Sequence, residues 1–78
     1  MKLPRDVSAD RLIKTLKSLG YEVVRQRGSH IKLRHLGPPT HVVSVPNHNP
    51  LKKGTLHAIL GEVARIRAVS VDEIREML

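Results

Sequence analysis

The chain has 78 residues and a formal net charge of +7, with 14 lysines and arginines against 7 acidic residues. Cysteine is absent, which excludes disulfides and a thiolate metal site, and no apolar run approaches the roughly 20 residues that span a bilayer. The excess of positive charge predicts an anionic partner, such as nucleic acid, an anionic membrane surface or an acidic protein.

Aromatic residues are almost missing, since Tyr21 is the single one and the chain has no Phe or Trp. Modules that bind single strands by stacking bases need aromatic platforms, so we do not expect that mode here. Residues 1–10 show no apolar stretch with a small-residue cleavage site, so no secretory signal is expected. We therefore expect one cytoplasmic domain over residues 1–78, with a core of Val, Ile and Leu.

Residues 7–20 have the pattern of an amphipathic helix with both ends marked. Ser8 suits the N-cap, Val7 and Leu12 occupy the positions of a hydrophobic staple, and Gly20 provides the C-terminal stop. Apolar residues at helical spacing predict a buried stripe, formed by Leu12, Ile13, Leu16 and Leu19.

Three strands are predicted next. Residues 21–27 and 29–35 read as a hairpin joined tightly at Gly28, and the β-branched run 40–45 reads as a third strand that ends before Pro46. The intervening loop contains a Gly-Pro-Pro sequence at residues 37–39.

A second helix is predicted over residues 53–66, where apolar residues recur at helical spacing. Ser70 and Glu73 form a capping box for a short last helix. The order helix, three strands, helix, short helix predicts one α+β domain. In it the two longer helices cover one face of a three-stranded antiparallel sheet.

The residues best suited to catalysis follow Gly28 and Ser29, which we expect to form the supporting turn. Strand alternation puts His30, Lys32 and Arg34 on one face. An ordinary imidazole can accept or donate a proton near neutral pH, and the two cations suit a phosphodiester substrate. The plainer interpretation is a solvated histidine in a strand of a basic protein.

A second group of candidates lies at the start of the second helix. Lys52 and Lys53 oppose the helix dipole there, so stability alone does not favour them. With Gly54 and Thr55 and the free N–H groups of the helix start, they would hold a phosphate. A solvated basic corner explains them equally well.

A metal site is not expected, because the five histidines have the spacing of no compact zinc signature. No cofactor is expected either. A Ser-His-Asp triad has no support, because Ser29 adjoins His30 and adjacent strand residues diverge.

Two segments carry a resemblance to a known family. Residues 20–30, Gly-Tyr-Glu-Val-Val-Arg-Gln-Arg-Gly-Ser-His, resemble the first hairpin of the HicA toxin family, also called the YcfA family. Residues 45–48, Val-Pro-Asn-His, followed by Leu-Lys-Lys-Gly-Thr-Leu at 51–56 and Ile-Leu at 59–60, are similar to its second signature. Both motifs occur in the right order with suitable spacing.

The resemblance implies a fold like the double-stranded-RNA-binding domain (dsRBD-like), which agrees with the element order above. It implies an mRNA interferase, the toxin of a type II toxin–antitoxin pair. His30 would be its catalytic histidine. The implied partners are RNA and a HicB-type antitoxin that covers the active face.

We expect metal-independent cleavage, in which His30 takes the proton of a ribose 2′-OH that attacks the adjacent phosphate and leaves a 2′,3′-cyclic product. Lys32, Arg34 and the helix start at 52–55 would hold the RNA backbone. Two other functions stay open. One is a module of the same fold that binds RNA phosphates without cutting, and the other is an interaction domain for an acidic protein.

Overall fold

The computed structural model describes residues 7–78. Its elements are α1 (Ala9–Ser18), β1 (Glu22–Arg27), β2 (His30–His35), β3 (His41–Pro46), α2 (Lys53–Arg67) and α3 (Val71–Met77). The strands form one antiparallel sheet in the order β1-β2-β3. The α+β fold predicted from the sequence is therefore confirmed. Residues 1–6, part of the segment in which no secretory signal is expected, lie outside the described residues.

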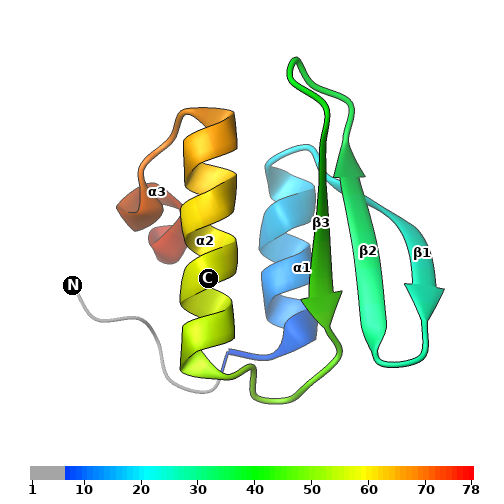
Figure 1. The fold of residues 1–78 in the computed structure, drawn as a ribbon. Helices are drawn as coiled ribbons and strands as arrows, with labels where there is room; N and C mark the ends of the chain where they lie inside the picture. The colour runs from blue at the N-terminus through cyan, green and yellow to red at the C-terminus, as the bar shows by residue number, and fades with distance from the viewer. Residues whose placement is uncertain (1–6) are drawn as a thin grey trace.

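The sheet has one face covered by helices and one open face. α1 and α2 lie on the same side of the sheet, and α3 packs against α2 (Figure 1). The core lies between these layers and consists of aliphatic side chains, with Leu12, Leu16, Leu33, Val45, Leu60, Val63 and Ile74 among the most buried. Figure 1 also shows the β1–β2 turn, the end of β3 and the start of α2 at one end of the molecule.

Capping residues fix the ends of α1 as the sequence predicts. The Ser8 hydroxyl accepts a hydrogen bond from the backbone N–H three residues ahead, at 3.1 Å. At the other end Gly20 has a φ of 100°, and the N–H of Tyr21 donates to the carbonyl of Leu16 at 3.0 Å. The helix is shorter than the predicted 7–20, because these capping residues lie outside its hydrogen-bonded turns.

The observed strands are shifted by about one residue from the predicted ranges. Tyr21 and Ser29 were expected in strands, but Tyr21 closes the end of α1 and Ser29 belongs to the turn. β3 includes Pro46, which pairs with His30 in the ladder. The predicted capping box of the last helix is present, with Glu73 N–H donating to the Ser70 hydroxyl at 3.0 Å.

Candidate functional site

β2 presents His30 on the open face of the sheet. Ile31 and Leu33 are buried, whereas His30, Lys32 and Arg34 are exposed. The alternation predicted from the sequence is therefore confirmed, because the apolar side chains of β2 turn toward the helices and its basic side chains turn away from them.

The turn before His30 fixes the place where this strand begins. Gly28 has a φ of 57°, a conformation that glycine adopts without strain. The turn spans only Gly28 and Ser29, since Arg27 and His30 are already paired. The backbone N–H of Asn47 donates to the carbonyl of Ser29 at 2.6 Å and ties the turn to the end of β3. The predicted supporting role of Gly28 and Ser29 stays a prediction, although their position agrees with it.

A bulge in β1 decides which arginines join His30. The ladder shifts by one residue at Val24, after which Arg25 pairs with Lys32 and Arg27 pairs with His30. Residues paired across antiparallel strands share a face, so both arginines lie on the open face. With unbroken alternation they would turn toward the helices instead.

These side chains surround a shallow hollow of about 300 Å³ on the open face, which we call the His30 hollow. Its lining residues are Arg25, Arg27, His30, Lys32 and Ser44. The ring of His30 is exposed and has no hydrogen-bond or ion-pair partner within residues 7–78. The hollow thus combines a free imidazole, three cations and a hydroxyl, with no carboxylate among its lining residues.

Arg34 lies on the same face, but it does not line the His30 hollow. It pairs across the ladder with Glu22, and their charged atoms are 4.0 Å apart. Both side chains are largely exposed, so this ion pair contributes little to stability. Arg34, which strand alternation groups with His30 and Lys32, thus lies one rung beyond Lys32 and outside the hollow.

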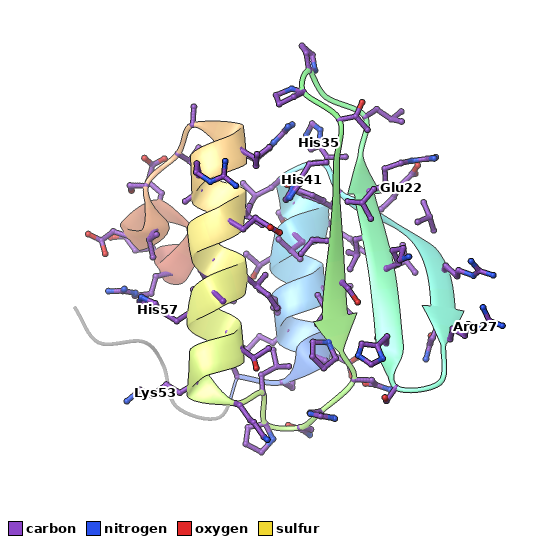
Figure 2. The ribbon with its side chains drawn as sticks, viewed as in Figure 1. Glu22, Arg27, His35, His41, Lys53 and His57 are labelled. Carbon is purple, nitrogen blue, oxygen red and sulfur yellow. The ribbon has the colours of Figure 1, made fainter. Side chains whose placement is uncertain are left out.

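The second predicted group, Lys52 to Thr55, forms the first turn of α2 and is separate from the His30 hollow. Lys52 is the N-cap and makes no side-chain capping bond, and the first turn holds no acidic residue. None of these residues lines the hollow. In Figure 2 Lys53 projects from the start of α2 on the helix side, whereas Arg27 projects from β1 on the far side of the sheet.

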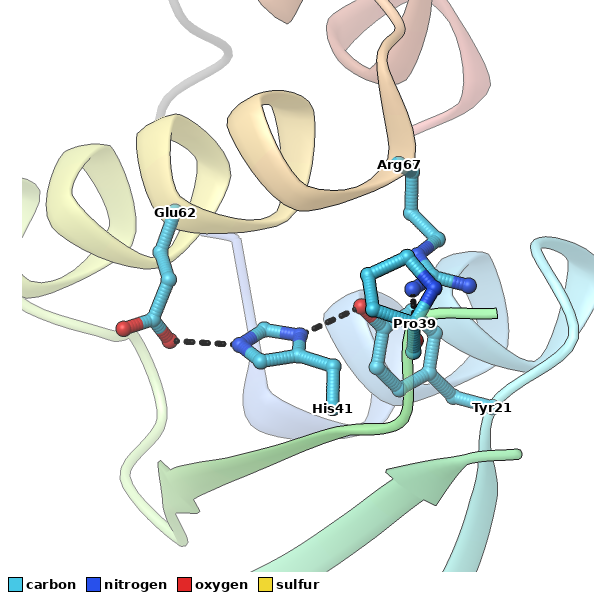
Figure 3. A network of polar contacts seen from close by, with 5 residues as sticks. All are labelled: Tyr21, Pro39, His41, Glu62 and Arg67. Atoms are coloured by element: carbon cyan, nitrogen blue, oxygen red, sulfur yellow. Dashed lines mark hydrogen bonds and ion pairs between the residues drawn. The ribbon is translucent and has the colours of Figure 1, made fainter. Parts of the chain in front are cut away.

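Two of the other histidines, His35 and His41, make polar contacts away from the His30 hollow. The Nδ1 of His41 lies 2.6 Å from the Tyr21 hydroxyl and its Nε2 lies 3.2 Å from a carboxylate oxygen of Glu62 (Figure 3). The Nδ1 of His35 accepts a hydrogen bond from the Gly37 N–H at 2.8 Å. Within residues 7–78 no three His, Cys, Asp or Glu side chains gather in a group that could hold a metal ion.

A family model described as "HicA toxin of bacterial toxin-antitoxin" matches residues 9–65. The chain belongs to this HicA toxin family. The matched residues include β1, β2, β3 and most of α2, and with them every site residue that the sequence analysis predicted. No curated protein and no solved structure was found to match the chain.

Membership in the HicA family makes the chain a toxin of a bacterial toxin–antitoxin system, and such a system implies an antitoxin partner. Every helix of this HicA chain within residues 7–78 is too short or too polar to span a membrane.

Three residues of the His30 hollow in this HicA chain were not predicted from the sequence, namely Arg25, Arg27 and Ser44. Ser44 could have been found from the register of the second hairpin, in which it pairs with Lys32. The arginines required knowledge of the bulge at Val24, which strand alternation does not reveal.

Proposed function

We propose that this HicA toxin is an endoribonuclease that cleaves mRNA without a metal ion and uses His30 as its single catalytic histidine. The observation that carries this proposal is the free, exposed imidazole of His30 inside a hollow lined by three cations. A site of that composition attracts a phosphodiester and repels a divalent cation.

The chemistry follows from the groups that surround the substrate. Neutral His30 accepts the proton of a ribose 2′-OH, and the resulting 2′-oxygen attacks the adjacent phosphorus atom. The bond from phosphorus to the 5′-oxygen then breaks, which leaves a 2′,3′-cyclic phosphate on one fragment. The 5′-oxygen of the other fragment takes a proton from the imidazolium or from water. Nearby cations stabilise the negative charge that develops on the phosphate oxygens.

Further contacts to RNA are proposed for the other basic residues. Lys32 borders the His30 hollow, and Arg34 continues the same face along β2. The turn formed by Lys52, Lys53, Gly54 and Thr55 would hold a flanking phosphate at the end of the molecule where β2 begins (Figure 1).

The antitoxin partner is proposed to be of the HicB type and to cover the open face of the sheet. Among residues 7–78, the paired strand residues of that face include four cations, at Arg25, Arg27, Lys32 and Arg34, and one carboxylate, that of Glu22. An antitoxin surface rich in carboxylates would be drawn to this face and would exclude RNA from it.

The decisive experiment compares RNA cleavage by the purified protein and its His30→Ala variant, in buffer with EDTA. The variant should cleave about 10²–10⁴-fold more slowly, because it lacks the group that transfers the proton. His57→Ala is the matched control, since His57 is an exposed histidine of α2 and should be dispensable.

Equal cleavage by the protein and the His30→Ala variant would remove His30 from the mechanism. Loss of cleavage on adding EDTA would show that a metal ion is required. RNA that binds to both proteins and stays intact would support the alternative of a non-catalytic RNA-binding module.

A further inference from the structure

We propose that Arg25, Arg27, Lys32 and Ser44 form a phosphate cradle that binds the RNA backbone beside His30. The proposal rests on the proposed function, because it concerns how RNA is held at the same hollow. Arg25, Arg27 and Ser44 are new to the site, and the bulge at Val24 is what brings the two arginines there.

The ladder arranges the cradle in two neighbouring rungs. Arg27 and His30 form the first rung, at the turn. Arg25, Lys32 and Ser44 form the second rung, which crosses all three strands. Rungs on one face are two residues apart along a strand, or roughly 7 Å, so a phosphate on the second rung lies close to the imidazole on the first.

The two arginines are available to a ligand. Neither Arg25 nor Arg27 forms an ion pair or hydrogen bond through its side chain with any residue of 7–78, and both are exposed. Arg34 differs from them, because its charge faces Glu22. A free guanidinium presents two parallel N–H groups that match two oxygens of a phosphate, and the hydroxyl of Ser44 adds a neutral donor beside the cations.

The cradle has no means of reading bases by aromatic stacking. Tyr21 is the single aromatic residue and is buried, 3% exposed, on the helix-covered side of the sheet. Binding through phosphates alone depends steeply on salt and hardly on base identity. The ligand is therefore the sugar–phosphate backbone of RNA, bound with little sequence preference at this point of contact.

The test measures binding of a single-stranded 2′-O-methyl RNA, which lacks the attacking hydroxyl and cannot be cleaved by the proposed route. Arg25→Gln and Arg27→Gln should each lower the affinity roughly tenfold at low salt. Each should also reduce the slope of log affinity against log salt by roughly 0.7. Ser44→Ala should lower the affinity and leave that slope unchanged, because it removes a donor without removing charge.

Arg65→Gln is the matched control, since Arg65 is an exposed arginine in the last turn of α2. A loss of affinity in this control as large as in Arg25→Gln and Arg27→Gln would overturn the cradle, because binding would then follow net charge alone. Unchanged affinity in both cradle variants would overturn it as well.

Oligonucleotides of uridine and of adenosine should bind with similar affinity, and a tenfold difference between them would overturn the backbone-only contact. Because 2′-O-methyl RNA stays intact, this binding test is independent of cleavage. Failure of the nuclease proposal appears separately, in the comparison of His30→Ala with the unaltered protein on cleavable RNA.

Discussion

Tyr21 joins the sheet to α2 through a short chain of polar contacts. Its hydroxyl lies 2.6 Å from the Nδ1 of His41, whose Nε2 faces Glu62 of α2 (Figure 3). A neutral His41 with its proton on Nε2 satisfies both contacts, since Nδ1 then accepts from the tyrosine and Nε2–H donates to the carboxylate. Burial raises the pKa of Tyr21, the charge of Arg67 opposes this rise, and that of Glu62 adds to it.

Titration of Tyr21 is directly measurable, because it is the only tyrosine in the chain. Its raised pKa means that the folded chain holds the phenolic proton more tightly than the unfolded chain, whose tyrosine titrates near 10.0. This contribution to stability is fully present below pH 10.0 and is lost as the pH rises through the folded-state pKa. Tyrosinate absorbance should therefore give a midpoint above 10.0 in the folded protein.

The control for this titration is Tyr21→Phe. It should unfold about 1 kcal/mol more easily near neutral pH, since the hydrogen bond to His41 is lost. The free energy of unfolding of this variant should also fall less at alkaline pH, because the ionisation of Tyr21 no longer contributes to the fall. A midpoint at or below 10.0 in the folded protein would contradict the effect of burial.

Individual side chains of the candidate site were predictable only where strand alternation is regular. His30 and Lys32 were found because β2 alternates without interruption from the turn onward. Arg25 and Arg27 were missed because a bulge changes the facing of every later residue in its strand, and the Val-Val pair that contains it looks like ordinary strand sequence. Pairing between strands, which decides such facing, is a tertiary property.

Helix ends determine where the elements of this chain begin and stop. Ser8 and Ser70 cap α1 and α3 through their hydroxyls, and both could be recognised in the sequence. The end of α2 differs, because Ala68 has a φ of 57° where glycine is usual. An alanine in this left-handed conformation costs about 1–2 kcal/mol, and nothing in the sequence around Ala68 indicates this conformation.

Replacing Ala68 with glycine should stabilise the protein. The substitution removes the strain of the left-handed alanine, but glycine also has more conformational freedom in the unfolded chain, which offsets part of this effect. The free energy of unfolding should therefore rise by about 0.5–1 kcal/mol. The measurement is the free energy of unfolding in urea.

Ala58→Gly is the matched control for that substitution, because Ala58 is an exposed residue inside α2. It should destabilise the protein by about 1 kcal/mol. A loss of stability in both variants would show that Ala68 carries no strain.

At the scale of the whole molecule, the two faces of the sheet have different roles. Its covered face holds the aliphatic core, and its open face holds the charged side chains around His30. The same strand serves both, since Leu33 is fully buried and lies directly beside Lys32. The overall fold was predictable because apolar periodicity and capping agree along the chain.

Leu33→Ala should therefore damage the stability of the protein and the site together. A buried leucine truncated to alanine costs about 2–5 kcal/mol. At roughly 0.05–0.15 kcal/mol per residue, a chain of this size has about 4–12 kcal/mol of stability to lose. Urea unfolding followed by circular dichroism measures the loss.

Val42→Ala controls for the loss of strand side chains in general. Val42 is 48% exposed and lies on the open face of β3, opposite Arg34. It should change stability by no more than about 0.5 kcal/mol. Equal losses in the two variants would contradict the assignment of the core to the covered face.

The bulge at Val24 has a consequence for encounters between copies of this chain. β1 is an edge strand of the sheet, and its outer backbone N–H and C=O groups offer a template on which a foreign strand could add. The irregular spacing at Val24 breaks that template, and the guanidinium groups of Arg25 and Arg27 would meet like charges on a second copy. The bulge that brings two arginines to the open face therefore also disfavours the pairing of a foreign strand with the β1 edge of the sheet.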